Sequence, residues 1–135
     1  MASAGAIFVL RGEVDRRALR RAMAVLEQGR VLGIAPEGTR SKTGAMQRGR
    51  GGAAYIACLM GVPLLPVGII GVEKALMELR RLRRPRVKVV IGRPFTLPPL
   101  PNKASSRSKR LRGYTTQVMQ RIAELLPEEY RGLYG

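Results

Sequence analysis

The sequence has 135 residues, 45% of them hydrophobic, and a formal net charge of +16 at pH 7. Such a chain can form one folded domain and is not compositionally disordered. The positive charge predicts an anionic partner: nucleic acid, anionic lipid or a phosphorylated substrate. With one cysteine and no histidine, an intrachain disulfide and a zinc site of the usual ligand types are excluded. Aromatic residues are too scarce for a platform that stacks single-stranded bases.

The first part of the chain predicts a strand, a helix and a second strand. Residues 6–10 (AIFVL) are a continuous apolar run that is typical of a buried strand. Apolar residues at helical spacing predict a helix over 16–28, and Gly29 suits its C-terminal end. A second apolar run at 31–35 (VLGIA) predicts another buried strand.

The rest of the chain continues the alternation of helices and strands. We expect helices over 52–60 and 72–82, strands over 64–70 and 86–91, a proline-rich connection over 95–106 and a C-terminal helix over 107–127. Pro66 indicates an edge or irregular strand. The alternation favours an α/β fold, with a mostly parallel central sheet flanked by helices and ligands bound beyond the carboxyl ends of its strands.

One uncharged stretch, residues 51–72, is long enough to cross a bilayer. It contains five glycines and two prolines, which would disrupt backbone bonding in the apolar layer. We therefore interpret it as a helix–turn–strand unit of a soluble domain. Cys58, in its apolar first half, is interpreted as a buried and inert thiol.

The loop at 35–41 (APEGTRS) has the parts of an anion-binding site. Gly38 allows a tight turn, and successive amides in such a turn can surround phosphate oxygens. Arg40 offers a planar fork that matches phosphate, and Thr39 and Ser41 add hydroxyl donors. From these residues alone, a plain surface turn with a solvated arginine is equally well supported.

The segment Pro-Glu-Gly-Thr-Arg-Ser closely resembles the third motif block of the glycerolipid acyltransferases of the 1-acylglycerol-3-phosphate acyltransferase type. Residues 5–11 (GAIFVLR) resemble the second block and residues 62–67 (VPLLPV) the fourth, in the family's order. The resemblance covers about 5–94 and implies a single partial acyltransferase domain over 1–135. It also implies acyl transfer from acyl-CoA or acyl carrier protein to a lysophospholipid-type acceptor, 1-acylglycerol-3-phosphate, in phospholipid biosynthesis, without a cofactor or metal.

The resemblance also implies roles for individual residues. Arg11 and Arg40 would contact the acceptor phosphate, although each position also suits a solvated arginine. Glu37 would position the acceptor or brace the loop by accepting backbone N–H bonds, and Gly38 would set the backbone shape. The expected acceptor-binding residues are Arg11, Glu37, Gly38, Thr39, Arg40 and Ser41.

The family's first block, a histidine and an aspartate four intervening residues later, has no counterpart because the chain contains no histidine. The resemblance implies that this histidine deprotonates the acceptor hydroxyl that attacks the acyl thioester, while the aspartate orients the imidazole. Glu13 and Asp15 are better interpreted as loop and N-cap residues than as a replacement. We therefore expect a truncated start, with a natural inactive relative as the alternative, and no activity of this chain alone.

Two basic segments, 80–86 and 103–112, leave a second function open. They would be the footprint of a basic, non-catalytic module that binds nucleic acid or anionic lipid. No nucleic-acid-binding fold signature accompanies them, and basic clusters also suit anionic membrane surfaces. We therefore favour the enzyme over a nucleic-acid partner, and we expect a cytoplasmic protein that is peripheral on the inner face of the membrane.

Overall fold

The structure, a computed structural model, describes residues 16–39, 41 and 43–135. The chain divides into two compact units, residues 1–34 and residues 35–135, and each is described by itself. The predicted strand over 6–10 lies outside the described residues, as do Arg11 and Arg40.

The first unit contains helix α1 (Arg16–Glu27), which confirms the helix predicted from apolar spacing. Ala18 and Ala22 are its buried residues. The strand predicted over 31–35 is wrong for the described chain: these residues form no ladder, and Val31 is 93% exposed. An apolar run becomes a strand only when a neighbouring strand pairs with it, and local sequence does not supply that neighbour.

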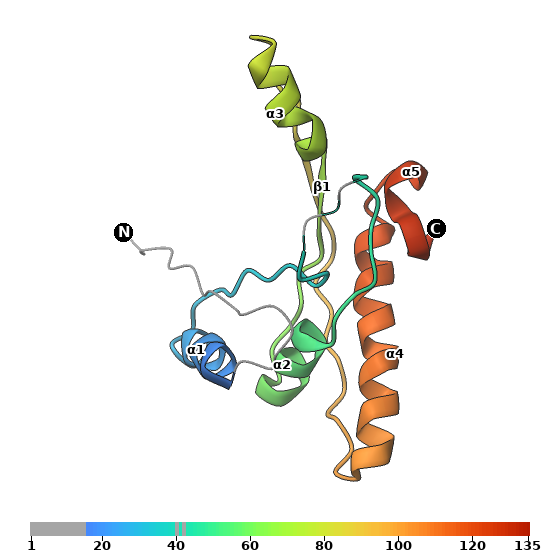
Figure 1. Cartoon of the computed structure of the whole chain (residues 1–135). Coiled ribbons are helices and arrows are strands. Elements are labelled where there is room, and N and C mark those ends of the chain that lie inside the picture. The colour runs from blue at the N-terminus through green and yellow to red at the C-terminus, as the bar shows by residue number, and fades with distance from the viewer. Residues whose placement is uncertain (1–15, 40, 42) are drawn as a thin grey trace. The chain divides into compact units, whose positions relative to one another are not determined.

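The second unit contains the remaining elements (Figure 1). They are α2 (Gly52–Met60), β1 (Val67–Ile70), α3 (Val72–Arg80), β2 (Lys88–Ile91), α4 (Ala104–Ala123), α5 (Glu128–Arg131) and a short 3-10 helix, η1 (Gly132–Tyr134). Helix α2 has the predicted bounds, because Gly61 ends it in the left-handed region at φ 62° and donates its N–H to Ala57 O. The helix–turn–strand interpretation of 51–72 is therefore confirmed.

Strands β1 and β2 pair antiparallel, in a register that runs from Val67↔Ile91 to Ile70↔Lys88. An isolated bridge, Leu64↔Phe95, continues the pairing beyond Pro66, whose missing N–H accounts for the interruption. The molecule thus combines helices with a small sheet. The expected mostly parallel central sheet is not present among the described residues, because the chain between β1 and β2 returns to the strand end it left.

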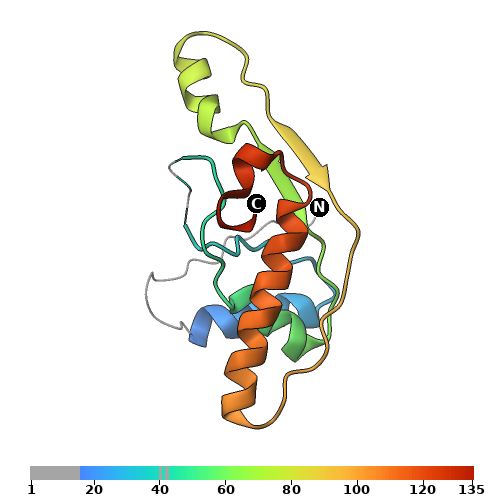
Figure 2. The same cartoon turned by 90° about the vertical axis from the view of Figure 1, so that its right-hand side faces the viewer.

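Helix α4 organises the core of the second unit, and Figures 1 and 2 show it running the length of that core. It begins at Ala104, earlier than the predicted 107, because residues 103–110 are mostly polar and show no apolar periodicity that would mark a helix start. Two buried clusters pack along it: Met46, Met119, Ala123 and Leu126 in one, and Ala54, Ala57, Leu97 and Val118 in the other. Met119, at 0% exposure, is the most buried of these side chains.

One face of the two-stranded sheet rests on the C-terminal end of α4. A Cβ added at Gly68 would lie 2.9 Å from Leu126 Cδ2, so the strand backbone is in direct contact with the segment that follows α4. The opposite face carries four β-branched side chains that are 38–65% exposed: Val67, Ile69, Val89 and Ile91. No described helix is long and apolar enough to cross a membrane.

Between β1 and β2 the chain makes a long excursion, residues 71–87, that we call the arm. In Figures 1 and 2 it carries α3 beyond the other elements of residues 35–135. At its root, Gly71 adopts φ 90°, and a side chain there would collide with the carbonyl oxygen of Arg86. The Tyr130 hydroxyl donates a 2.6 Å hydrogen bond to Glu73 Oε1, which ties the root to α5.

Candidate anion-binding site

The predicted phosphate loop is a turn without helix or strand, as the sequence indicates. Gly38 donates its N–H to Ala35 O over 3.1 Å and adopts φ 66°, a conformation that glycine enters at little cost. Glu37 is half-buried and Thr39 is exposed. The turn therefore lies at the surface of the second unit, with Gly38 and Thr39 exposed.

Arg50 lies directly against this turn, although it is not among the residues that the sequence predicts for the site. Its N–H donates a 2.7 Å hydrogen bond to Pro36 O. A Cβ added at Gly38 would come within 3.0 Å of Arg50 Cδ and 3.1 Å of Nε, so the side chain runs alongside the glycine. The absence of a side chain at Gly38 thus lets an exposed guanidinium approach the turn. In the sequence Arg50 belongs to the run Arg48–Gly49–Arg50 at the loop's end, which does not indicate that it lies beside Gly38.

The other predicted residues of the loop differ in what they contact. Ser41 Oγ lies 3.3 Å from Thr43 Oγ1, and Thr43 Oγ1 accepts a 3.4 Å hydrogen bond from the Ala45 N–H. Ser41 is therefore part of a local hydroxyl pair. Within the described part of the chain, Glu37 makes no hydrogen bond to a backbone amide, so its bracing role stays a prediction. The roles of Arg11 and Arg40 also stay predictions, since both lie outside the described residues.

The segment that carries Arg50 is fixed by the core beneath it. A Cβ added at Gly49 would lie 2.5 Å from Met119 Cγ, so the segment backbone rests on α4. Gly49 donates its N–H to the Tyr134 hydroxyl over 3.0 Å, and Met46 donates to Tyr130 O over 2.7 Å. These contacts with α4, α5 and η1 give Arg50 a defined backbone position below the turn.

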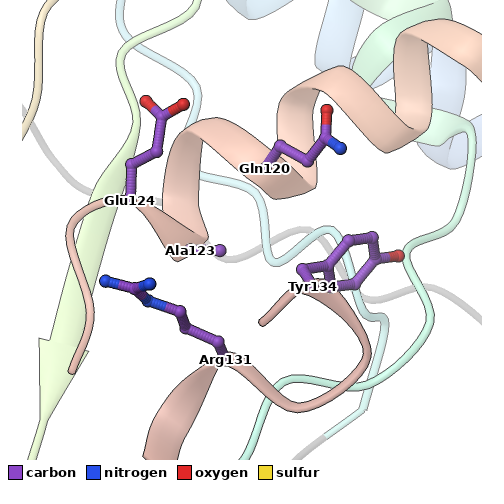
Figure 3. Close-up of a pocket in the computed structure, with 5 residues that line it drawn as sticks. All are labelled: Gln120, Ala123, Glu124, Arg131 and Tyr134. Atoms are coloured by element: carbon purple, nitrogen blue, oxygen red, sulfur yellow. The ribbon is translucent and has the colours of Figure 1, made fainter. Parts of the chain in front are cut away.

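A separate hollow of about 440 Å³ lies at the C-terminal end of α4 (Figure 3). It is lined by Gln120, Ala123, Glu124, Arg131 and Tyr134, and it includes none of the predicted acceptor-binding residues. The Arg131 Nε donates to Leu126 O over 3.0 Å, and the Glu124 carboxylate would repel a phosphate. We assign this hollow no ligand.

The lone cysteine, Cys58, was predicted to be buried, and the structure shows it less buried than that. Cys58 packs at the edge of the cluster around Ala54 and Val118, and it is half-buried. Burial raises the pKa of its thiol, which lowers the fraction of reactive thiolate at neutral pH. This is the behaviour expected of a packing residue.

The sequence model of the family described as Acyltransferase matches residues 1–70 of the chain. That range contains all three segments that resemble the family's motif blocks: 5–11, 36–41 and 62–67. The chain belongs to the acyltransferase family, as the resemblance predicted.

Two curated relatives carry a more specific name. The chain is 35% identical over 87 residues to a chloroplastic 1-acyl-sn-glycerol-3-phosphate acyltransferase of Brassica napus, covering 63% of this chain and 25% of the relative. It is 34% identical over 87 residues to the chloroplastic protein of the same activity from Arabidopsis thaliana, covering 63% and 24%. The chain thus spans about a quarter of the length of the curated relatives it matches. No solved structure matches it.

Proposed function

We propose that this chain binds the phosphate of a lysophospholipid acceptor, 1-acylglycerol-3-phosphate, in a protein that acylates it for phospholipid biosynthesis. The acyl donor would be acyl-CoA or acyl carrier protein. The observation that carries the proposal is the turn at 35–38, with Gly38 in the left-handed region and Arg50 alongside it. Family membership and the activity named for both relatives support it.

The chemistry of the acceptor suits these groups. A phosphate monoester carries nearly two negative charges at neutral pH and several strong acceptor oxygens. Backbone amides of the turn and the guanidinium of Arg50 are donors that it can bind, and a guanidinium binds two oxygens at once. In this proposal Arg40 and Arg11 add two further guanidinium groups, while Glu37, Thr39 and Ser41 position the acceptor and the loop.

A base for the reaction is a separate requirement. An alcohol is a weak nucleophile at neutral pH, and a general base accelerates its attack by about 10²–10⁴-fold. Because the chain contains no histidine, we propose that it binds acceptor without transferring the acyl group. Transfer from acyl-CoA by the chain itself, lost on Arg40→Ala, would contradict this division of roles.

We also propose that the protein works as a peripheral protein at the inner face of a membrane, in contact with the cytoplasm. Two observations support this: the acceptor is a lipid, and the chain carries a net charge of +16, which favours anionic surfaces. The mostly parallel sheet remains a prediction for the acyltransferase domain as a whole.

Binding of short-chain acceptors by the chain tests the proposed function. We expect 1-hexanoylglycerol-3-phosphate to bind at least tenfold more tightly than 1-hexanoylglycerol, as measured by titration calorimetry. Hydrogen bonds to charged groups contribute about 1.5–3 kcal/mol, so Arg40→Lys and Arg50→Lys should each weaken binding of the phosphate ligand roughly 10–100-fold. Both substitutions keep the net charge and remove only the planar fork.

Matched controls separate the site from the general positive field. Arg81→Lys and Arg84→Lys, on residues that are exposed, should change the dissociation constant less than about twofold. Equal affinity for the two ligands would contradict the proposed function. If the phosphate ligand binds tightly but Arg40→Lys and Arg50→Lys leave its affinity unchanged, this loop is not the binding site.

A further inference from the structure

The tip of the arm, residues 79–86, combines exposed apolar side chains with a dense cluster of positive charge. Its sequence, LRRLRRPR, holds five arginines and no acidic residue. Leu79 is 62% exposed and Leu82 is 97% exposed, and all five arginines are exposed. Exposed leucine and arginine side chains thus lie within eight residues of one another at the tip.

Leu82 occupies a backbone position that leucine disfavours. The Leu82 N–H donates to Leu79 O over 3.1 Å and the Arg83 N–H to Glu78 O over 2.9 Å, the hydrogen-bond pair that closes a helix around a left-handed residue. Glycine usually fills that position, and Leu82 is the one non-glycine residue with positive φ (55°) in the described part of the chain. Since its side chain is almost fully exposed, packing within the described chain does not explain a leucine there.

The arm is anchored to the rest of the second unit only at its root. Gly71 lets the two chain segments of the root approach each other, and the hydrogen bond between Tyr130 and Glu73 holds the start of α3. The tip lies at the far end of α3 and projects away from the other elements of residues 35–135 (Figures 1 and 2). Leu82 is therefore positioned to contact a surface of another molecule or assembly.

We propose that the arm tip docks onto an anionic lipid bilayer, with Leu79 and Leu82 entering the apolar boundary and the arginines contacting headgroup phosphates. The inference rests on the proposed membrane location and assigns it to one segment. Apolar side chains beside basic ones are the combination that binds this interface. The arm has no aromatic residue for stacking on bases, and five arginines would repel a second copy of the tip.

Substitution of Leu82 by glycine gives the sharpest test, because it should relieve the backbone strain and preserve both fold and charge. We expect Leu82→Gly to weaken binding of the chain to phosphatidylcholine vesicles containing about one quarter phosphatidylglycerol roughly tenfold, from the loss of one buried leucine. Leu133→Gly, at another leucine that is 71% exposed, is the matched control and should change binding less than about twofold. Cosedimentation measures both.

Charge substitutions decide which basic segment docks. Removing two arginines of the tip with Arg81→Gln and Arg84→Gln should weaken vesicle binding about thirtyfold, since each arginine near an anionic surface contributes about a fivefold change in affinity. The matched pair Arg110→Gln and Arg112→Gln removes two exposed charges of α4 and should have little effect. The opposite ranking would identify α4 as the docking surface and overturn the proposal.

A tryptophan at the tip reports insertion directly, because the chain contains no other tryptophan. The emission of Leu82→Trp should shift to the blue with the anionic vesicles, but not with phosphatidylcholine alone or with duplex RNA. A shift with RNA and none with vesicles would make the arm a nucleic-acid contact. Vesicle binding that Leu82→Gly leaves unchanged would overturn the arm's role alone. If the unaltered chain does not bind the vesicles, both the arm and the membrane location fail, whereas acceptor binding is tested separately.

Discussion

Helices α4 and α3 both carry apolar residues at helical spacing, but those of α4 are buried or half-buried and those described in α3 are largely exposed. Met119 of α4 is 0% exposed and contacts the segment that carries Arg50, whereas Met77 of α3 is 54% exposed. Periodicity indicates that a helix forms, but burial depends on what other segments bring to its apolar face. Helix α4 packs against α2, β1 and the 46–50 segment, while the far end of α3 packs against none of them. The same sequence signal therefore marks a core in one region and an outward-facing surface in the other.

The largest expected effect contrasts the two methionines. Met119→Ala removes a fully buried side chain and leaves a cavity under the 46–50 segment, so it should lower the free energy of unfolding by about 2–5 kcal/mol. Met77→Ala should change it by less than about 0.5 kcal/mol, because the side chain is already largely in water. Urea denaturation of the two variants measures the difference. Equal losses would mean that the arm is packed in solution and would break the comparison.

A second contrast uses two glycines, one at the arm's root and one in α4. Gly71→Ala places a side chain at φ 90° and against the carbonyl of Arg86, so it should cost about 2 kcal/mol or more. Gly113 has no atom within 4 Å of an added Cβ and lies inside a helix, so Gly113→Ala should stabilise by about 0.5–1 kcal/mol. Thermal denaturation of both variants would show shifts of opposite sign. A stabilising Gly71→Ala would mean that the root is open.

The smallest expected effect concerns the hydrogen bond between Tyr130 and Glu73. This bond is the main cause that lowers the pKa of Glu73 below its usual 4.5, with the charge of Lys74 adding to it. Because the folded-state pKa is the lower one, the bond stabilises fully above the usual glutamate range and is lost as the pH falls through the folded pKa. The same bond raises the pKa of Tyr130 above its usual 10. The stability that the bond contributes is therefore lost at alkaline pH, as the pH rises through the raised pKa of Tyr130.

Replacing the phenol tests this linkage. Between pH 6 and pH 3 the melting temperature of the chain should fall more than that of Tyr130→Phe, which keeps the ring and lacks the donor. The difference should be smaller than either glycine effect, because the pair is exposed to solvent. Parallel acid profiles would show that the bond does not hold the arm's root.

Much of the second unit could be predicted from sequence, because its boundaries are marked by local chemistry. Gly61 ends α2, Pro66 interrupts the strand pairing, and prolines keep the chain extended before α4. What local sequence could not give was pairing between distant segments. Residues 31–35 have a strand's composition without a described partner, and the antiparallel order of β1 and β2 depends on the direction in which the arm returns.

The candidate site shows the same division. The turn around Gly38 follows from residue types that favour left-handed backbone, and the sequence located it. Arg50 could not be predicted, because its position beside Gly38 depends on a hydrogen bond to Pro36 and on Gly49, which lets the backbone rest on Met119. Tertiary packing places Arg50, a third candidate for contacting the phosphate, beside the turn, and no sequence motif marks this position.

The arm leaves the sheet after Ile70 and returns at Lys88, and these two residues are paired neighbours. Its ends are therefore held together by the sheet whatever the length between them. The entropy lost in closing a flexible loop grows only with the logarithm of its length, about 0.6 kcal/mol for each doubling. Insertions or deletions between α3 and β2 should thus be tolerated by the remainder of the unit. Natural variation could lengthen or shorten the arm's reach without altering the turn at 35–38.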